Sequence, residues 1–184
     1  MKVTVFGSAR LGEATAEYQD AVRLGTLLAQ AGHTVMSGGY GGLMEAVSRG
    51  AHEAGGDVVG ITMAAWDGRL VPNRYLSRQL AAETLFARIE QLIKADSLIA
   101  LPGGAGTLGE VALAWNLLQM KLIPPTPVIL VGSGWATMVE AFRSNLIVNE
   151  HDLAMLRVVA GVDEAVAAVG SASIEPAVDT AFRG

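Results

Sequence analysis

LIALPGGAGTLGE, residues 98–110, joins a short apolar run to three glycines and then to a segment with helical periodicity. A strand, a glycine turn and a helix in this order are the repeating unit of parallel α/β sheets. The glycines allow the backbone close to a ligand, and the first N–H groups of the helix have no partner inside it. With the helix dipole behind them, these groups form an anion site, most often for phosphate. We expect the phosphate contacts to come from Pro102, Gly103, Gly104, Gly106 and Thr107.

Two side chains at the start of this helix can add chemistry to the anion site. Thr107 can cap the helix or donate its hydroxyl to the same anion. Glu110 follows one turn later on the same face. Because phosphate repels a carboxylate, the presence of Glu110 at this position indicates that its side chain acts on a part of the ligand other than the phosphate. The alternative is an acidic residue that the helix dipole favours and that has no chemical role.

The order of strand, glycine turn and helix occurs twice before residue 98. The predicted elements are a strand over 2–7, a helix over about 13–31, a strand over 33–37 and a helix that begins at Leu43. This alternation predicts an α/β, Rossmann-like parallel sheet with helices on both faces and right-handed crossovers. Ligands in such sheets bind at the carboxyl ends of the strands, where all three glycine turns would gather.

The rest of the chain continues the same alternation. We predict strands over 57–62, 78–83, 97–101, 128–131 and 156–159, and helices over 84–95, 107–122 and 135–144. Asp163 is predicted to cap a last helix that ends near Gly170. Residues 63–77 show no clean period, and a loop of this length is typically functional, so we expect it to lie over the site. The prediction is one domain over residues 1–170 and a tail over 171–184.

Composition excludes several classes of function. The 184 residues are 51% apolar, yet no apolar run approaches the roughly 18 residues of a membrane span, so we expect no membrane association. The first residues read as a strand and not as a signal peptide, which predicts a cytoplasmic protein. With no cysteine and three scattered histidines we expect no metal site. A net charge of −5 without a basic run argues against nucleic acid as a partner.

The second glycine turn, residues 37–42, reads SGGYGG. Four glycines in five positions (Gly38, Gly39, Gly41 and Gly42) exceed what a tight turn requires, so ligand contact is favoured over a purely structural turn. The spacing does not fit the G-x-G-x-x-G fingerprint of dinucleotide sites, and no lysine follows a glycine loop as in a P-loop. We therefore expect a mononucleotide, and no separate cofactor.

The glycine motifs also carry a resemblance to a known family. PGGAGTLGE, residues 102–110, is similar to the PGGxGTxxE signature of the LONELY GUY family, phosphoribohydrolases that split cytokinin riboside 5'-monophosphates. Many members were once labelled lysine decarboxylases. Residues 37–44 resemble the second glycine motif of that family, and Gly7-Ser8 resembles the first. The resemblance runs from about residue 3 to residue 170, and it implies that all three turns contact the substrate.

The resemblance also points to an arginine. Residues 85–89 read LFARI where the family has M-H-x-R-K, so Arg88 retains the arginine whereas the Met, His and Lys are replaced. By composition alone Arg88 would be a solvated helix residue; through the resemblance it becomes a catalytic candidate together with Glu110. A guanidinium can hold phosphate at two points or stabilise a departing base. The sequence does not decide between these contacts.

The resemblance implies release of a free base and ribose 5-phosphate from AMP or from a cytokinin riboside monophosphate. The alternative is a non-catalytic carrier, because related proteins bind molybdenum cofactor, whose terminal phosphate suits the same turns. Lysine decarboxylation would need pyridoxal phosphate on a lysine, and none of the three lysines lies in a glycine motif, so this hypothesis is rejected. The apolar run 111–118 and the habits of the family predict a homodimer with the central helix near the interface.

Overall fold

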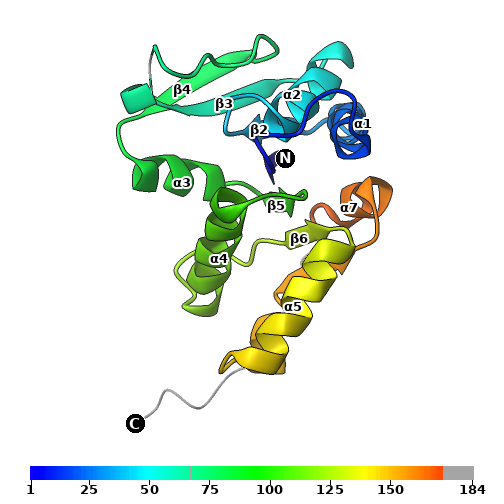
Figure 1. Cartoon of the computed structure of the whole chain (residues 1–184), viewed down its shortest axis with the longest axis vertical. Helices are drawn as coiled ribbons and strands as arrows, with labels where there is room; N and C mark the ends of the chain where they lie inside the picture. The colour runs from blue at the N-terminus through cyan, green and yellow to red at the C-terminus, as the bar shows by residue number, and fades with distance from the viewer. Residues whose placement is uncertain (67, 172–184) are drawn as a thin grey trace.

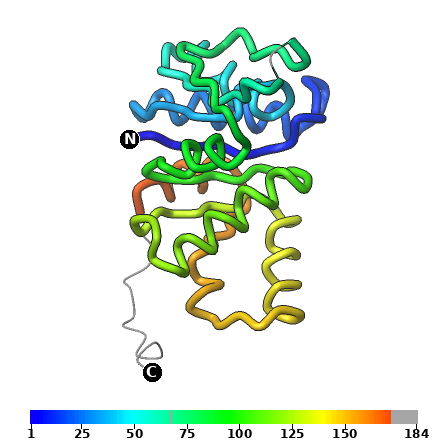
Figure 2. Tube along the Cα trace, turned by 90° about the vertical axis from the view of Figure 1, so that its left-hand side faces the viewer, coloured from blue at the N-terminus to red at the C-terminus, as the bar shows by residue number. Residues whose placement is uncertain are grey.

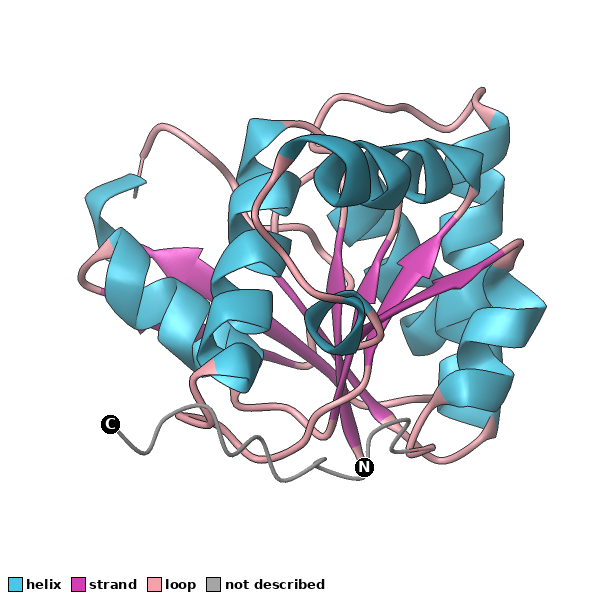
Figure 3. Ribbon diagram, turned by 90° about the horizontal axis from the view of Figure 1, so that it is seen from below, coloured by secondary structure: helices cyan, strands magenta, loops and turns pink. Residues whose placement is uncertain are grey.

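Seven parallel strands form one sheet with helices on both of its faces in the computed structural model, which describes residues 1–66 and 68–171 (Figures 1 and 3). The strands are β1 (Lys2–Phe6), β2 (Thr34–Ser37), β3 (Val58–Met63), β4 (Arg78–Ala82), β5 (Ser97–Ala100), β6 (Val128–Val131) and β7 (Leu156–Val159). The helices are α1 (Ala16–Gln30), α2 (Leu43–Glu53), η1 (Ala64–Trp66, a 3₁₀ turn), α3 (Leu85–Ile93), α4 (Ala105–Gln119), α5 (Ser133–Asn145), α6 (Glu150–Leu153) and α7 (Val162–Ala168). The predicted Rossmann-like fold is confirmed. The predicted tail lies, apart from Ser171, outside the described residues.

The strand order is β4-β3-β2-β1-β5-β6-β7. The chain therefore starts in the middle of the sheet, moves outward to β4, and returns to the other side of β1 with β5. Figure 2 shows the first strand running between the two halves of the molecule that result. In a sheet of this kind the crevice beyond the carboxyl ends of β1 and β5, where the order reverses, is the place for a ligand.

Alternate residues of the strands face opposite layers of helices. Val3 and Val5 belong to the core beneath α1, α2 and α7. Phe6 and Leu98 belong to the core beneath α3, α4 and α5. Because both faces are covered, β5 and β6 are buried along their whole length and are mostly apolar, as parallel strands usually are.

The central helix is shifted toward the N-terminus relative to its prediction. Helix α4 begins at Ala105, after Gly104, and it ends at Gln119. Lys121 has a left-handed backbone (φ 56°). Its N–H donates to the carbonyl of Leu118, and the N–H of Leu122 donates to that of Leu117, both at 2.9 Å. These two bonds are the Schellman arrangement, which stops a helix and satisfies its last carbonyls.

Two further helix predictions are wrong in detail. Helix α1 begins at Ala16, later than expected, because the side chain of Thr15 accepts the N–H of Tyr18 and caps it. The residue before α7 is Gly161, so Asp163 is not the cap. Asp163 lies in the first turn and pairs with Arg23 at 2.6 Å. The short helix α6 was not predicted.

The loop between β3 and β4 is fixed to the second glycine turn. The N–H of Asn73 donates to the carbonyl of Gly39 at 2.8 Å, and the Asn73 side chain donates to the carbonyl of Tyr40 at 3.1 Å. The hydroxyl of Tyr40 in turn accepts the N–H of Met63 at 2.8 Å. These bonds hold the start and the later part of the loop near the carboxyl edge of the sheet. Across residues 1–66 and 68–171, no helix has the length and apolar character needed to cross a membrane.

Candidate active site

The three glycine turns meet at the switch point and are bonded to one another. The N–H of Ser8 donates to the carbonyl of Pro102 at 3.1 Å, which joins the first turn to the third. The carbonyl of Ser8 accepts the N–H of Leu43 at 2.8 Å, which joins the first turn to the start of α2. Gly42 has a φ of 70°, and a Cβ at this position would overlap the backbone of Ser8 and Ala9. The second turn can therefore approach the first this closely because it has a glycine at residue 42.

A cavity of about 750 Å³ opens where the turns meet, within the size range of small-molecule sites. It is lined by residues of all three turns, of α3 and α4, and of the loop after β3. Of the residues that the sequence singled out, the lining includes Gly7, Ser8, Gly41, Arg88, Gly104, Gly106, Thr107 and Glu110.

Arg88 enters this cavity from α3, a helix that begins after Thr84, whose side chain accepts the N–H of Ala87. The Arg88 side chain is buried, with 7% of its surface exposed. Its Nε donates to the carbonyl of Ile61, within β3, at 2.7 Å. Arg88 is therefore not the solvated helix residue that composition alone would predict.

Glu110 lies next to Arg88 on the cavity lining. Its Oε1 lies 3.5 Å from Nη1 of Arg88, and 14% of its side chain is exposed. Burial raises the pKa of Glu110 to about 7, and the charge of Arg88 opposes that rise. Burial also lowers the pKa of Arg88, and the negative charge of Glu110 opposes this shift. Glu110 is thus a buried carboxyl that titrates near neutral pH, which is typical of acid–base and electrostatic roles in enzymes.

Thr107 does not cap α4, contrary to the first of its two predicted roles. It is the third residue of the helix, and Gly104 precedes the first turn. Leu108 N–H closes that turn on the carbonyl of Gly104 at 3.0 Å. The side chain of Thr107 packs against Gly103 and lies on the lining of the cavity. Its second predicted role, donating a hydroxyl to an anion, stays a prediction.

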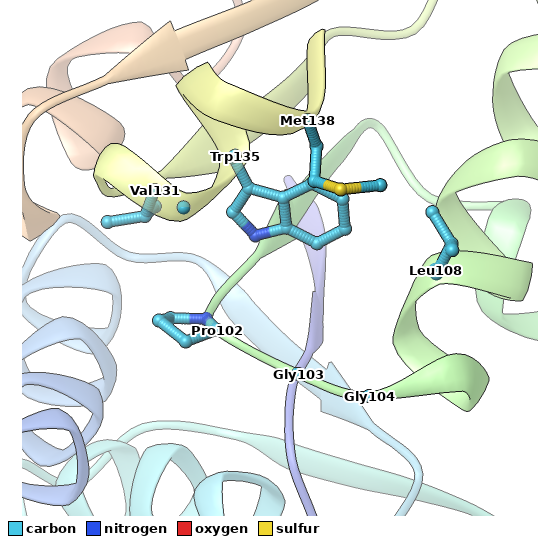
Figure 4. A pocket seen from close by; sticks show the side chains of 8 residues that line it. Pro102, Gly103, Gly104, Leu108, Val131, Trp135 and Met138 are labelled. Carbon is cyan, nitrogen blue, oxygen red and sulfur yellow. The ribbon is translucent and has the colours of Figure 1, made fainter. Parts of the chain in front are cut away.

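Five predicted binding residues do not line this cavity. Gly38 lies behind Arg88, Gly39 packs against Thr62 and Gly60, and Gly42 packs against the first turn. Pro102 and Gly103 line a second cavity of about 320 Å³ between α4 and α5 (Figure 4). Leu108, Val131, Trp135 and Met138 make that second cavity apolar. Because it contains no charged side chain, we place the chemistry in the larger cavity.

Sequence reasoning missed several residues of the larger cavity. These are Ala9, Arg10, Tyr40, Met44, Trp66, Leu70 and Ala105. Arg10 closely follows the first turn, and Tyr40 lies among the glycines of the second turn. Their positions in these motifs could have predicted that they line the cavity. Trp66 lies in the loop that was expected over the site. Within the described part of the chain, no group of three or more His, Cys, Asp or Glu side chains could hold a metal ion.

These features define a Rossmann-like α/β protein with a polar ligand cavity at the switch point of its sheet. The chain belongs to the SLOG cluster4 family, whose model matches residues 1–126. The resemblance to the LONELY GUY proteins is thereby confirmed at the level of the family.

Individual relatives support this placement. An uncharacterized protein of Archaeoglobus fulgidus is 34% identical over 133 residues, which is 72% of this chain and 85% of that one. The cytokinin riboside 5'-monophosphate phosphoribohydrolase LOG of Oryza sativa subsp. japonica is 38% identical over 114 residues. That match covers 59% of this chain and 47% of the rice protein, so the chain spans about half the length of this curated relative.

A solved structure shares both the fold and much of the length. The molybdenum cofactor carrier protein of Chlamydomonas reinhardtii is 28% identical, with a TM-score of 0.71. The alignment covers 93% of this chain and 96% of the carrier. Relatives of this chain thus include proteins named as phosphoribohydrolases and a protein named as a carrier.

Proposed function

We propose that this protein is a phosphoribohydrolase that cleaves the N-glycosidic bond of a nucleoside 5'-monophosphate, AMP or a cytokinin riboside monophosphate. The observation that carries the proposal is the buried pair of Arg88 and Glu110, 3.5 Å apart, on the same cavity as the start of α4. Phosphate binding requires the N-terminus of the helix but no carboxyl. Burying a carboxyl beside that site costs free energy, so the presence of Glu110 there favours a catalytic role over a role in phosphate binding.

The phosphate would bind at the start of α4. The first backbone N–H groups of α4, after Gly104, point along the helix axis beyond its N-terminus, and the helix dipole favours an anion there. Arg10, exposed on the cavity lining, adds a positive charge to the cavity. Thr107, in the first turn of the helix, offers its hydroxyl.

Hydrolysis proceeds through an oxocarbenium-like state, in which the sugar becomes positive and the base becomes negative. In its ionised form Glu110 stabilises the sugar cation or activates the attacking water. Arg88 favours the ionised form of Glu110 and stabilises the negative charge of the departing base. The oxygen of water bonds to the anomeric carbon, the bond to the base nitrogen breaks with its electron pair on the base, and one water proton ends on the base.

A second candidate function is a carrier for a phosphate-bearing ligand such as molybdenum cofactor. The likeness to the Chlamydomonas reinhardtii carrier favours it, because that alignment spans nearly the whole of both chains. A carrier would use the start of α4 for the phosphate. It would not need a carboxyl that titrates near neutral pH, so we rank it second.

The discriminating experiment is a screen of nucleoside 5'-monophosphates that measures free base and ribose 5-phosphate. The phosphoribohydrolase proposal predicts release of both in equal amounts from at least one adenine nucleotide. The control is Glu110→Gln, prepared in parallel, which excludes a contaminating nucleosidase. Tight binding of nucleotides without release of base from any of them would favour the carrier.

We also propose that the protein is a homodimer that pairs near α4. This helix is apolar nearly all round, which is typical of a helix covered on more than one side. Val111, Ala114 and Leu118 are buried in the core of the same chain, whereas Ala112 and Met120 are exposed. Phe86 on α3 leaves 79% of its surface uncovered. A second copy of the chain would cover these apolar surfaces.

A further inference from the structure

Two aromatic rings that the proposed chemistry does not use lie beside Arg88. Tyr40 comes from the second glycine turn and Trp66 from η1. The ring centroids are 5.6 Å apart with planes inclined at 53°. The guanidinium carbon of Arg88 lies 6.0 Å from the centroid of each ring. Both residues line the larger cavity, so together they form an aromatic wall on it.

The two rings differ in how firmly they are held. Tyr40 is 5% exposed, and its hydroxyl and carbonyl are both bonded, to Met63 and Asn73. Trp66 is half-buried and rests against Tyr40 at the edge of the cavity. The half-buried indole of Trp66 on the cavity lining offers an aromatic surface to a ligand. Tyr40, which is held by its hydrogen bonds, packs against the indole.

The contacts along the cavity follow an order. The start of α4 suits phosphate, Glu110 is one turn further into the same helix, Arg88 contacts Glu110, and the aromatic wall lies beside Arg88. A nucleoside monophosphate has phosphate, ribose and base in the matching order, with the scissile bond between ribose and base. If Glu110 and Arg88 act at the bond between ribose and base, the base lies against the aromatic wall, because the wall is beside Arg88.

We propose that Trp66 is the residue that binds the base: its ring stacks on a planar aromatic base, while Tyr40 fixes the position of the Trp66 ring. This inference rests on the proposed function for the placement of the ribose. Base–aromatic stacking accepts any planar base, so the wall selects an aromatic leaving group over an aliphatic one. It also puts the base within reach of Arg88, where negative charge develops in the reaction.

The test measures the affinities of AMP and of ribose 5-phosphate by calorimetry, for the parent, Trp66→Leu and Trp66→Phe. The two ligands share the ribose 5-phosphate part, and AMP has adenine where ribose 5-phosphate has a hydroxyl. The ratio of their affinities therefore measures the contribution of the aromatic wall to binding the base. Removing one stacking ring is commonly worth on the order of tenfold in affinity. We expect Trp66→Leu to weaken AMP about tenfold and to leave ribose 5-phosphate unchanged, and Trp66→Phe to bind AMP nearly as the parent does.

A second measurement does not depend on the leucine variant folding. The chain has three tryptophans, and AMP should quench the emission of the parent while ribose 5-phosphate should not. The quenching should be lost in Trp66→Phe. Equal weakening of both ligands in Trp66→Leu, or equal affinity of the parent for both, would overturn the proposal. If the parent binds AMP more tightly than ribose 5-phosphate through Trp66 but releases no base, the proposed function is contradicted and the role of the aromatic wall in binding the base is supported.

Discussion

Gly38 and Arg88 depend on each other: a Cβ at Gly38 would overlap Nη2 of Arg88. Gly38, which directly follows β2, therefore leaves the space that the guanidinium of Arg88 occupies. The Nε of Arg88 is fixed at the same time by the carbonyl of Ile61. A residue that touches no ligand thus decides where a proposed catalytic group can lie.

Gly38→Ala should displace Arg88 from the position it now holds. Overpacking of this kind typically costs about 1–3 kcal/mol of the free energy of unfolding. Base release should fall at least about tenfold, because the displaced guanidinium no longer faces the departing base. Denaturant unfolding and single-turnover base release measure the two effects. Gly12→Ala is the matched control, since a Cβ there meets no atom within 4 Å and stability should stay unchanged. Gly38→Ala with parental activity would show that the position of Arg88 does not matter.

Base release should depend on pH through Glu110. Its pKa is raised to about 7, so the carboxylate predominates above that pH and the neutral acid below it. Because the ionised form is the active one in the proposed chemistry, the rate should rise with pH from 6 and level off above 8. A pH profile of single-turnover base release with AMP tests this. A rate that falls as pH rises through 7 would assign Glu110 the role of a proton donor.

Arg88→Gln should shift the midpoint of the pH profile of base release to a higher pH. The charge of Arg88 opposes the rise in the pKa of Glu110, so its removal leaves burial unopposed. The remaining base release should be slower at every pH and should level off at a higher pH than in the parent. An unchanged midpoint in Arg88→Gln would mean that another group sets the pH dependence.

The sequence predicted the sheet, its parallel direction and the gathering of three glycine turns, because each turn follows an apolar strand and precedes a periodic helix. It placed Arg88 through a resemblance to a family and could not have placed it by periodicity. On α3 the arginine is a polar residue whose burial depends on Gly38 and on Ile61 of β3, both distant in sequence.

The errors at the site have local causes. The sequence predicts Thr107 as a possible helix cap because the glycines at 104 and 106 weaken the helical signal around Ala105, whereas the helix starts at Ala105. Tyr40 and Trp66 come together through hydrogen bonds between a glycine turn and a long loop. Contacts of that kind leave no period in the sequence, so the aromatic wall was not predicted.

Ala112→Glu should convert the proposed dimer to a monomer. Ala112 is exposed on α4, so a carboxylate there leaves the core of the chain intact but would be buried at an interface. Light scattering over micromolar concentrations should give the mass of a dimer for the parent and of a monomer for the variant. Ala141→Glu, on the exposed side of α5, is the control and should not change the mass. A monomeric parent at all these concentrations would rule out the dimer.

The most direct test of the proposed chemistry compares Glu110→Gln with the parent by single-turnover base release and by direct affinity for AMP. The substitution keeps the shape of the side chain and removes the charge that matters in the transition state. A preorganised charge is commonly worth on the order of 3 kcal/mol, or about a hundredfold in rate. Glu110→Gln should therefore bind AMP about as well as the parent and release adenine about a hundredfold more slowly, whereas Thr107→Ala should weaken binding first. Unimpaired release of adenine by Glu110→Gln would contradict the account.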